Sequence, residues 1–123
     1  MSAYFSNGPA GGECLNLARA PIMLRVVIDP DGKIDALDQP EDSVRPGEAV
    51  HVYMLARASN VAFVDGVRGG RRHGWREVMS HYVHFAEPVP AEITNDNARW
   101  AAWCAAEEDR LRAMHEALIR GGT

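Results

Sequence analysis

Cysteine is scarce in this chain, with Cys14 and Cys104 the two cysteines among its 123 residues. Two cysteines are too few for a disulfide framework, and in an intracellular protein they are usually reduced and buried, with a single bridge between them as the alternative. No apolar run approaches the roughly 20 residues that span a bilayer, and the N-terminus lacks the pattern of a signal peptide. We therefore expect a cytoplasmic protein that does not enter the membrane.

Recognisable catalytic motifs are also missing. The sequence has no phosphate-binding glycine motif, and its candidate nucleophiles Ser80, Cys14 and Cys104 lie in neither a nucleophile elbow nor a cysteine-protease context. The carboxylates at residues 29–38 lack the glycine and the distal glutamate of a calcium loop. The sequence therefore predicts a protein that is not an enzyme and that carries no cofactor.

The composition is that of an ordinary folded domain. Hydrophobic residues make up 46% and charged residues 24% of the chain, which are values near the averages of folded soluble proteins. A chain of 123 residues forms one hydrophobic core and leaves no room for a second domain. The net charge of -4 would not draw the whole molecule to nucleic acid or to an anionic membrane, so any basic function has to be local.

The first half of the chain has the pattern of β-strands joined by turns. Residues 22–28 form a nearly continuous apolar run that Arg25 interrupts, which is typical of a central strand. Proline and glycine within residues 29–33 favour a tight turn, so residues 34–37 are expected to pair back on that strand.

Further strands are expected up to residue 85. Alternation over residues 50–55, a turn at residues 59–60 and an apolar run at residues 61–64 predict a second hairpin. Residues 67–74 contain three glycines and three arginines and are expected to form an irregular loop. Residues 75–80 fit a helical turn and a strand equally well, although the residues that follow favour a strand.

A single amphipathic helix is predicted at the C-terminus. Pro88 and Pro90 end the preceding element, Thr94 or Asn95 is a suitable N-cap, and the helix is expected to run to about Arg120. At 100° per residue the helix has one apolar stripe. This stripe contains Trp100, Trp103, Cys104, Leu111, Met114 and Leu118.

Glu107 projects from the middle of this stripe, where an unpaired charge is costly. It either meets a strand-borne arginine, with Arg25 and Arg57 as candidates, or leaves that part of the stripe open to water. The stripe itself either covers one face of the sheet or binds a partner or a second copy of the chain. In the second case the contacts come from Trp100, Trp103, Glu107, Leu111, Met114 and Leu118.

These patterns together predict the fold class α+β. The strand candidates precede the helix without strand and helix alternation, which favours an antiparallel sheet over a doubly wound one. We expect a small antiparallel β-sheet or partly open barrel of about five to six strands, followed by one C-terminal amphipathic helix. Residues 1–123 then form a single domain, with a β-rich body over residues 1–90 and the helix within residues 91–123.

The densest basic cluster of the chain runs from residue 68 to residue 76. Its arginines, flexible glycines and tryptophan are the groups that bind phosphates and stack on a base. The alternative is a solvated loop whose arginines pair with local carboxylates. Under the first interpretation, contacts to nucleic acid or to an acidic partner come from Arg68, Arg71, Arg72, Trp75 and Arg76.

Glu77, His81 and His84 are candidates for a metal site. If this stretch is helical, the three side chains converge, and with His73 or Cys104 they offer donors that zinc accepts. On a strand, however, His81 and His84 point to opposite faces. Because the residues that end the stretch favour a strand, and the chain has no paired cysteine motif, we expect no metal.

Several short stretches of the first half carry a resemblance, namely residues 4–9, 11–13, 25–27, 35–39, 46–48 and 52–53. With them the chain resembles small uncharacterised accessory proteins of actinobacteria and their phages, although Gly11 and Gly12 stand where that group has Asp-Gly. No activity is attached to that group, so the resemblance implies a phage-associated accessory protein and no site residues.

Three functional hypotheses follow from the sequence. The first is a non-enzymatic protein-interaction or assembly protein, phage-associated, that binds another protein or itself through the arginine-glycine segment and the helix. The second is a nucleic-acid-binding accessory protein that uses residues 68–76. The third is a small metalloprotein or enzyme built on Glu77, His81 and His84.

Overall fold

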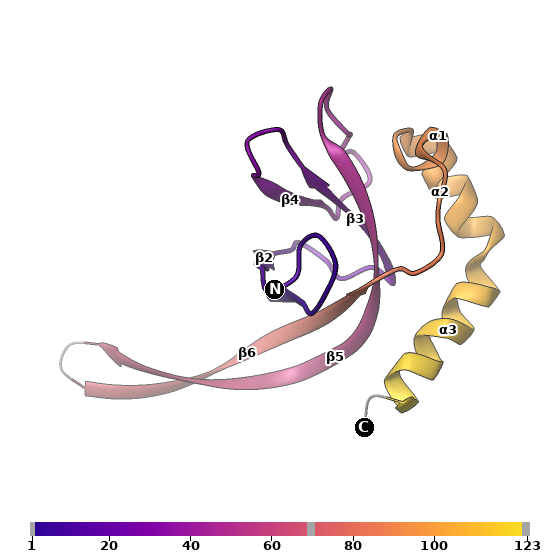
Figure 1. The fold of residues 1–123 in the computed structure, drawn as a ribbon. Coiled ribbons are helices and arrows are strands. Elements are labelled where there is room, and N and C mark those ends of the chain that lie inside the picture. The colour runs from indigo at the N-terminus through magenta and orange to yellow at the C-terminus, as the bar shows by residue number, and fades with distance from the viewer. Residues whose placement is uncertain (1, 69–70, 122–123) are drawn as a thin grey trace.

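The structure is a computed structural model that describes residues 2–68 and 71–121, with side chains over residues 2–57 and 80–121. The described residues form one six-stranded mixed sheet in the order β2-β1-β6-β5-β3-β4, followed in the chain by helices (Figure 1). This architecture confirms the α+β class. The strands are β1 (Ser2–Phe5), β2 (Cys14–Asn16), β3 (Met23–Ile28), β4 (Ile34–Leu37), β5 (Ala49–Arg68) and β6 (Arg71–His84), and the helices are α1 (Ala91–Thr94), α2 (Asn97–Ala106) and α3 (Glu108–Gly121).

The sequence predicted an antiparallel sheet, but the sheet is mixed. β1 runs parallel to β6, with Ser2 opposite Met79 and Phe5 opposite Tyr82, whereas the other neighbouring strands pair antiparallel. Turn residues indicate which strands form hairpins, and hairpins are always antiparallel. β1 and β6 are far apart in the chain, so tertiary packing and not a turn sets their direction.

The predicted hairpin of residues 50–55 and 61–64 is wrong. β5 continues through the turn expected at residues 59–60, and its pairing with β6 has an irregularity between Ser59 and Ala62. Such an irregularity accommodates extra residues within a strand pair. The residues expected to form a turn therefore lie within β5, at an irregularity in its pairing with β6.

The irregular loop predicted over residues 67–74 is also wrong. The two strands stay paired until Arg68 lies opposite Arg71, and the ambiguous residues 75–80 belong to β6. Gly69 and Gly70 lie outside the described residues. Cross-strand pairing overrides the glycine content because each added pair supplies backbone hydrogen bonds that a loop would leave to water.

The central strands are buried on both faces, because alternate side chains point to opposite sides of a strand. The cluster inside the curled sheet contains Ala3, Phe5, Leu24, Val26, Tyr53 and Tyr82. The cluster between the sheet and the helices contains Met23, Val52, Met54, Phe85 and Leu111. The sheet therefore has an inner face and an outer face, and α2 and α3 cover the outer one.

The sheet curls until its two edges approach each other at Asp38. The carboxylate Oδ2 of Asp38, which follows β4, accepts hydrogen bonds from the backbone amides of Ala18 and Arg19, which follow β2. The Nε of Arg19 donates to the carbonyl oxygen of Asp38 at 2.6 Å. Contacts of the one buried residue Asp38, and not a further ladder among the described strands, thus complete a nearly closed barrel.

The loop between β1 and β2 is organised around the hydroxyl group of Tyr53. This hydroxyl accepts a hydrogen bond from the amide of Ala10 at 2.8 Å and donates one to the carbonyl oxygen of Asn7 at 2.8 Å. Gly8 has a φ of 73°, and a Cβ there would lie 2.8 Å from the Tyr53 hydroxyl and 2.7 Å from the Cβ of His84. Glycine is therefore needed at position 8.

The single helix predicted from the sequence is divided near its start. α1 ends at Thr94, and Asp96, not Thr94 or Asn95, caps α2 by accepting a hydrogen bond from the amide of Arg99 at 2.9 Å. A carboxylate at this position satisfies an amide that has no partner within the helix. The cap therefore starts a new helix two residues after α1.

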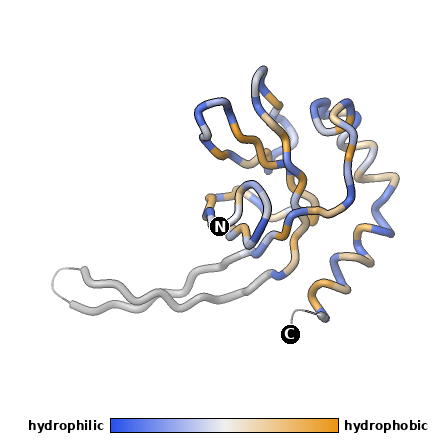
Figure 2. Tube along the Cα trace, in the orientation of Figure 1, coloured by the Kyte–Doolittle hydropathy of each residue, from blue (hydrophilic) through white to orange (hydrophobic). Residues whose placement is uncertain are grey.

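The second interruption, at Glu107, is slight. The amide of Glu107 donates to the carbonyl of Trp103 at 3.0 Å, and the amide of Leu111 donates to the carbonyl of Glu107 at 2.9 Å. Helical hydrogen bonding therefore continues from α2 to α3, and the two helices follow one another along the sheet (Figure 1). Figure 2 shows hydrophilic and apolar residues alternating along α3, as in a helix with one face packed. None of the helices in the described part of the chain has the length and apolar character needed to cross a membrane.

We predict that Tyr53→Phe destabilises the protein by about 1–3 kcal/mol, because it leaves the buried amide of Ala10 without its acceptor. Urea unfolding followed by tryptophan fluorescence measures this loss. Tyr4→Phe is the matched control, since the half-buried Tyr4 hydroxyl makes no hydrogen bond within the described residues. Equal stability of the two variants would contradict the role assigned to Tyr53.

Candidate functional site

The predicted basic contact residues all lie toward the far end of the β5–β6 hairpin. Arg68 and Arg71 are opposite each other at the last described pair, Arg72 is opposite Val67, and Trp75 and Arg76 follow on β6. Their side chains lie outside the part of the chain whose side chains are described. Their backbone is paired strand and not the flexible loop that the sequence had suggested.

This part of the hairpin, residues 57–68 and 71–77, is named the arm. β3 pairs with β5 only as far as Met54, and β1 pairs with β6 only from Met79 onward. Within the arm the two strands therefore pair with each other and with no other described strand. Figure 1 shows the arm extending away from the rest of the sheet.

The candidate metal ligands do not come together among the described side chains. His81 contacts Tyr4 at a ring-centroid distance of 5.8 Å, whereas His84 contacts Tyr53 at 5.4 Å and His51 at 6.3 Å. The two histidines therefore lie on opposite faces of β6, as expected for a strand. Glu77 lies outside the described side chains, and those described contain no group of three residues that could hold a metal ion.

The apolar stripe of the helices packs mostly against the sheet. Trp100 stacks on Trp103 with ring centroids 5.4 Å apart, and Trp103 meets Phe85 edge to face. Leu111 is buried in the outer cluster, and Met114 packs beside it. Leu118, with 36% of its surface exposed, lies beyond this contact. A role of the stripe in partner binding stays a prediction.

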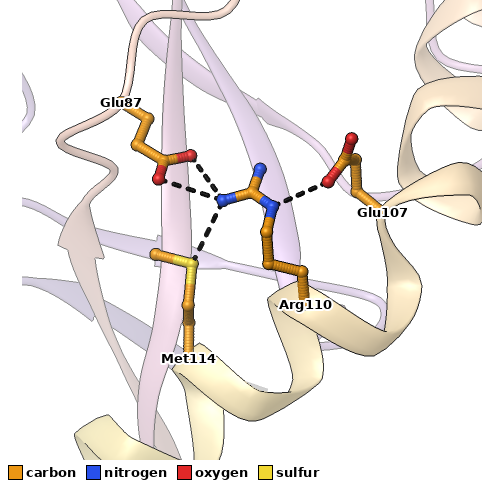
Figure 3. Close-up of polar contacts among 4 residues, drawn as sticks. All are labelled: Glu87, Glu107, Arg110 and Met114. Carbon is orange, nitrogen blue, oxygen red and sulfur yellow. Dashed lines mark hydrogen bonds and ion pairs between the residues drawn. The ribbon is translucent and has the colours of Figure 1, made fainter.

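Glu107 finds its partner on its own helix and not on a strand. Its carboxylate accepts a hydrogen bond from the Nε of Arg110 at 2.7 Å, and neither Arg25 nor Arg57 takes this place. Arg110 also binds the carboxylate of Glu87 at 2.7 Å and contacts the sulfur of Met114 (Figure 3). The carboxylate of Glu107 is therefore paired in this exposed cluster and is not an isolated charge.

A cleft of about 660 Å³ lies where α2 and the start of α3 cross the outer face of β3. Its walls also include the segment before β3 and the end of β4 with the residues that follow. Most of the lining is apolar, and three arginines and one glutamate contribute charge. The lining residues used below are Arg19, Ile22, Arg25, Leu37, Trp100 and Ala101.

Arg25 is the buried charge of this cleft, with 3% of its surface exposed. One terminal nitrogen donates to the carbonyl oxygen of Thr94 at 2.9 Å and the other to Oδ1 of Asn97 at 3.0 Å. Its guanidinium carbon lies 5.5 Å from the ring centroid of Trp100, within the range of a cation–π contact. Burial lowers the pKa of Arg25, and interactions with Cys104 and Asp42 oppose this effect.

Cys104 lines the same cleft, but its thiol is not activated. Burial raises the pKa of Cys104 to about 11, although the neighbouring guanidinium of Arg25 lowers it in part. A thiol with such a pKa stays protonated at neutral pH and is a poor nucleophile. Both cysteines are free, as expected, but Cys14 is exposed and not buried.

A second cleft, of about 480 Å³, lies on the β3–β4 side and is strongly acidic. Lys33 and Arg45 are its basic residues. Its acidic lining residues are Asp29, Asp35, Asp38, Glu41, Asp42 and Glu48. We name this region the acidic cleft.

Sequence reasoning missed the cleft at Arg25, although one signal pointed to it. Arg25 is the charged residue within the apolar run of β3, and a charge in such a run has to find compensation when the strand is buried. The pattern could not tell which element supplies that compensation. Thr94 and Asn97 are about 70 residues away in the chain, at separations of 69 and 72.

Comparisons of this chain with protein-family models, with curated proteins and with solved structures found no match.

We predict that Leu111→Ala lowers the free energy of unfolding by about 2–5 kcal/mol, because Leu111 anchors α3 in the outer cluster. The neighbouring change Arg110→Met removes two exposed ion pairs and should leave the unfolding free energy nearly unchanged. Urea unfolding of the two variants tests this contrast. A larger loss in the Arg110 variant would show that the exposed cluster, and not the apolar contact, holds α3.

We predict that His51 titrates below its ordinary pKa. Burial lowers the pKa of His51, and the imidazole of His84 lowers it further. Because the unfolded chain then binds more protons, this contribution to stability is complete above about pH 6.5 and is lost as the pH falls through the folded-state pKa. In an NMR titration, His84→Gln should move the His51 midpoint upward. An unchanged or lower midpoint would contradict this coupling.

Proposed function

We propose that this protein is a non-enzymatic assembly protein whose arm binds the acidic cleft of a second copy of the chain. The separation of charge between the arm and the rest of the molecule carries the proposal. Residues 57–77 contain five arginines and two carboxylates, which gives a net charge of +3. The remaining eight basic and fifteen acidic residues give the rest of the chain a net charge of -7.

The backbone of the arm supports the same proposal. A two-stranded hairpin without further strands is marginally stable in water, and each of its edges offers unpaired amide and carbonyl groups. A partner that adds a strand or covers one edge supplies the missing hydrogen bonds. An arm that pairs only with itself among the described strands is therefore suited to binding.

The acidic cleft supplies the complementary surface. It lies next to β4, which is an edge strand of the sheet, and exposed Asp35 and Glu41 belong to its lining. Opposite charges attract over about 8 Å at physiological ionic strength, which orients two copies before contact.

A contact between two different surfaces of identical chains is head-to-tail. Such contacts close into a ring or continue as a filament. The resemblance of the first half of the chain to phage accessory proteins favours the setting of a phage-associated assembly.

Binding of nucleic acid by the arm is the second candidate function. The same concentration of arginines favours it, because guanidinium groups bind phosphates and a two-stranded β-ribbon fits a groove of duplex DNA. This function would need the arm but not the acidic cleft, so the two candidates differ in an experiment.

The test compares an arm variant, R71E/R72E, with an acidic-cleft variant, D35R/E41R. Sedimentation velocity at about 0.05 M and about 0.5 M NaCl should show self-association of the unaltered protein that weakens with salt. Each variant should be monomeric at low salt. An equimolar mixture of the two variants should associate again, because the unaltered arm of D35R/E41R can bind the unaltered acidic cleft of R71E/R72E.

Arg99→Glu, on an exposed position of α2, is the control for added negative charge and should associate like the unaltered protein. A protein that is monomeric at both salt concentrations would refute the assembly proposal. Binding of a short mixed-sequence DNA duplex that R71E/R72E abolishes and D35R/E41R leaves intact would instead assign the arm to nucleic acid.

A further inference from the structure

We infer that the cleft at Arg25 binds a small organic anion with an apolar or aromatic body. None of its lining residues belongs to the arm, and it adjoins the acidic cleft, since Leu37 lines both. Its volume of about 660 Å³ falls in the range of about 300–1,000 Å³ that small-molecule sites occupy. Its lining combines positive charge with a mostly apolar wall, which is the pattern of a site that orients an amphipathic ligand.

The negative charge of the proposed ligand follows from the surroundings of Arg25. Among the described residues no carboxylate forms an ion pair with Arg25, and its partners are a neutral carbonyl, a neutral amide and an aromatic ring. Its Nε is buried and has no hydrogen-bond partner within the described residues. Asp42 acts on Arg25 without forming an ion pair and opposes the effect of burial on its pKa only in part, so burying this charge remains costly. A bound anion would reduce this cost, because the apolar surroundings strengthen its attraction to the guanidinium group.

Arg19 provides the direct anchor for the ligand. It is exposed and lines the cleft, and its Nε is fixed on the carbonyl oxygen of Asp38 at 2.6 Å. A guanidinium group has five donors, so its terminal nitrogens remain for a carboxylate. The third arginine of the cleft, Arg112, is already paired with Glu108 at 2.9 Å. Arg19 and Arg25 therefore make the positive potential.

The apolar part of the ligand has a flat wall to lie against. Trp100 lines the cleft, and its stacking on Trp103, with an interplanar angle of 20°, fixes the ring. Ile22 and Leu37 line the cleft from the strand side. An aromatic ring with a carboxylate fits this arrangement, because the ring covers apolar side chains while the carboxylate reaches the arginines.

Naphthalene-2-carboxylate is the probe, and its neutral amide is the comparison compound. In a two-dimensional NMR titration of the ¹⁵N-labelled protein, the carboxylate should bind with a Kd at or below about 1 mM and shift the indole signal of Trp100. The amide should bind about tenfold more weakly, since it forms no charge-assisted hydrogen bond. Arg25 is left unchanged, because its replacement could unfold the protein.

Two pairs of variants locate the site. Ala101→Phe fills the cleft and should weaken binding of the carboxylate about tenfold or more, whereas the exposed neighbour Ala102→Phe should leave it unchanged. Arg19→Gln should weaken binding of the carboxylate about tenfold. Arg99→Gln removes the same charge outside the cleft and should leave binding unchanged. Equal binding of amide and carboxylate, no saturable binding, or equal effects within either pair would overturn the inference.

Discussion

Burial of the central strands on both faces is the constraint on which the rest of this structure depends. β3 and β5 send alternate apolar side chains to opposite sides, so a flat sheet would leave one large apolar face in water. Curling covers the inner face, because Phe5, Tyr53 and Tyr82 fill the enclosed space. The outer face remains, and the helices that follow β6 cover it. The barrel and the helical layer are thus two solutions to one requirement.

Arg25 occupies a position of β3 that points to the outer face, and therefore lies under the helices. A buried guanidinium needs acceptors, which a continuous helix would hold in its own hydrogen bonds. The end of α1 provides one, since the last carbonyl groups of a helix have no partner within it, and Arg25 donates to that of Thr94. Asn97, in the first turn of α2, provides the other. The division between α1 and α2 and the burial of Arg25 are therefore linked, and the cleft forms where they meet.

The arm, unlike the core, is not covered by neighbouring strands among those described. Its strands gain no cover from β1 or β3, so the hydrogen bonds within the hairpin are its backbone contacts among the described strands. Positive charge is concentrated there and negative charge elsewhere, which suits a segment that works by contact with another surface. The buried apolar residues lie in the two clusters. The arm and the acidic cleft, by contrast, are proposed to bind through charged residues outside these clusters.

The sequence by itself determined the local features: the apolar run of β3, the turn at residues 29–33, the apolar helical stripe and the opposite directions of His81 and His84. Each depends on the side-chain period of a strand or helix or on a turn residue, all of which can be read from neighbouring positions. Tertiary structure decided the parallel pairing of β1 with β6, the extension of the hairpin into an arm, the partner of Glu107 and the cleft at Arg25. These features depend on contacts between distant residues, and the free energy of such contacts outweighs local turn and helix preferences of a fraction of a kcal/mol to about 1 kcal/mol.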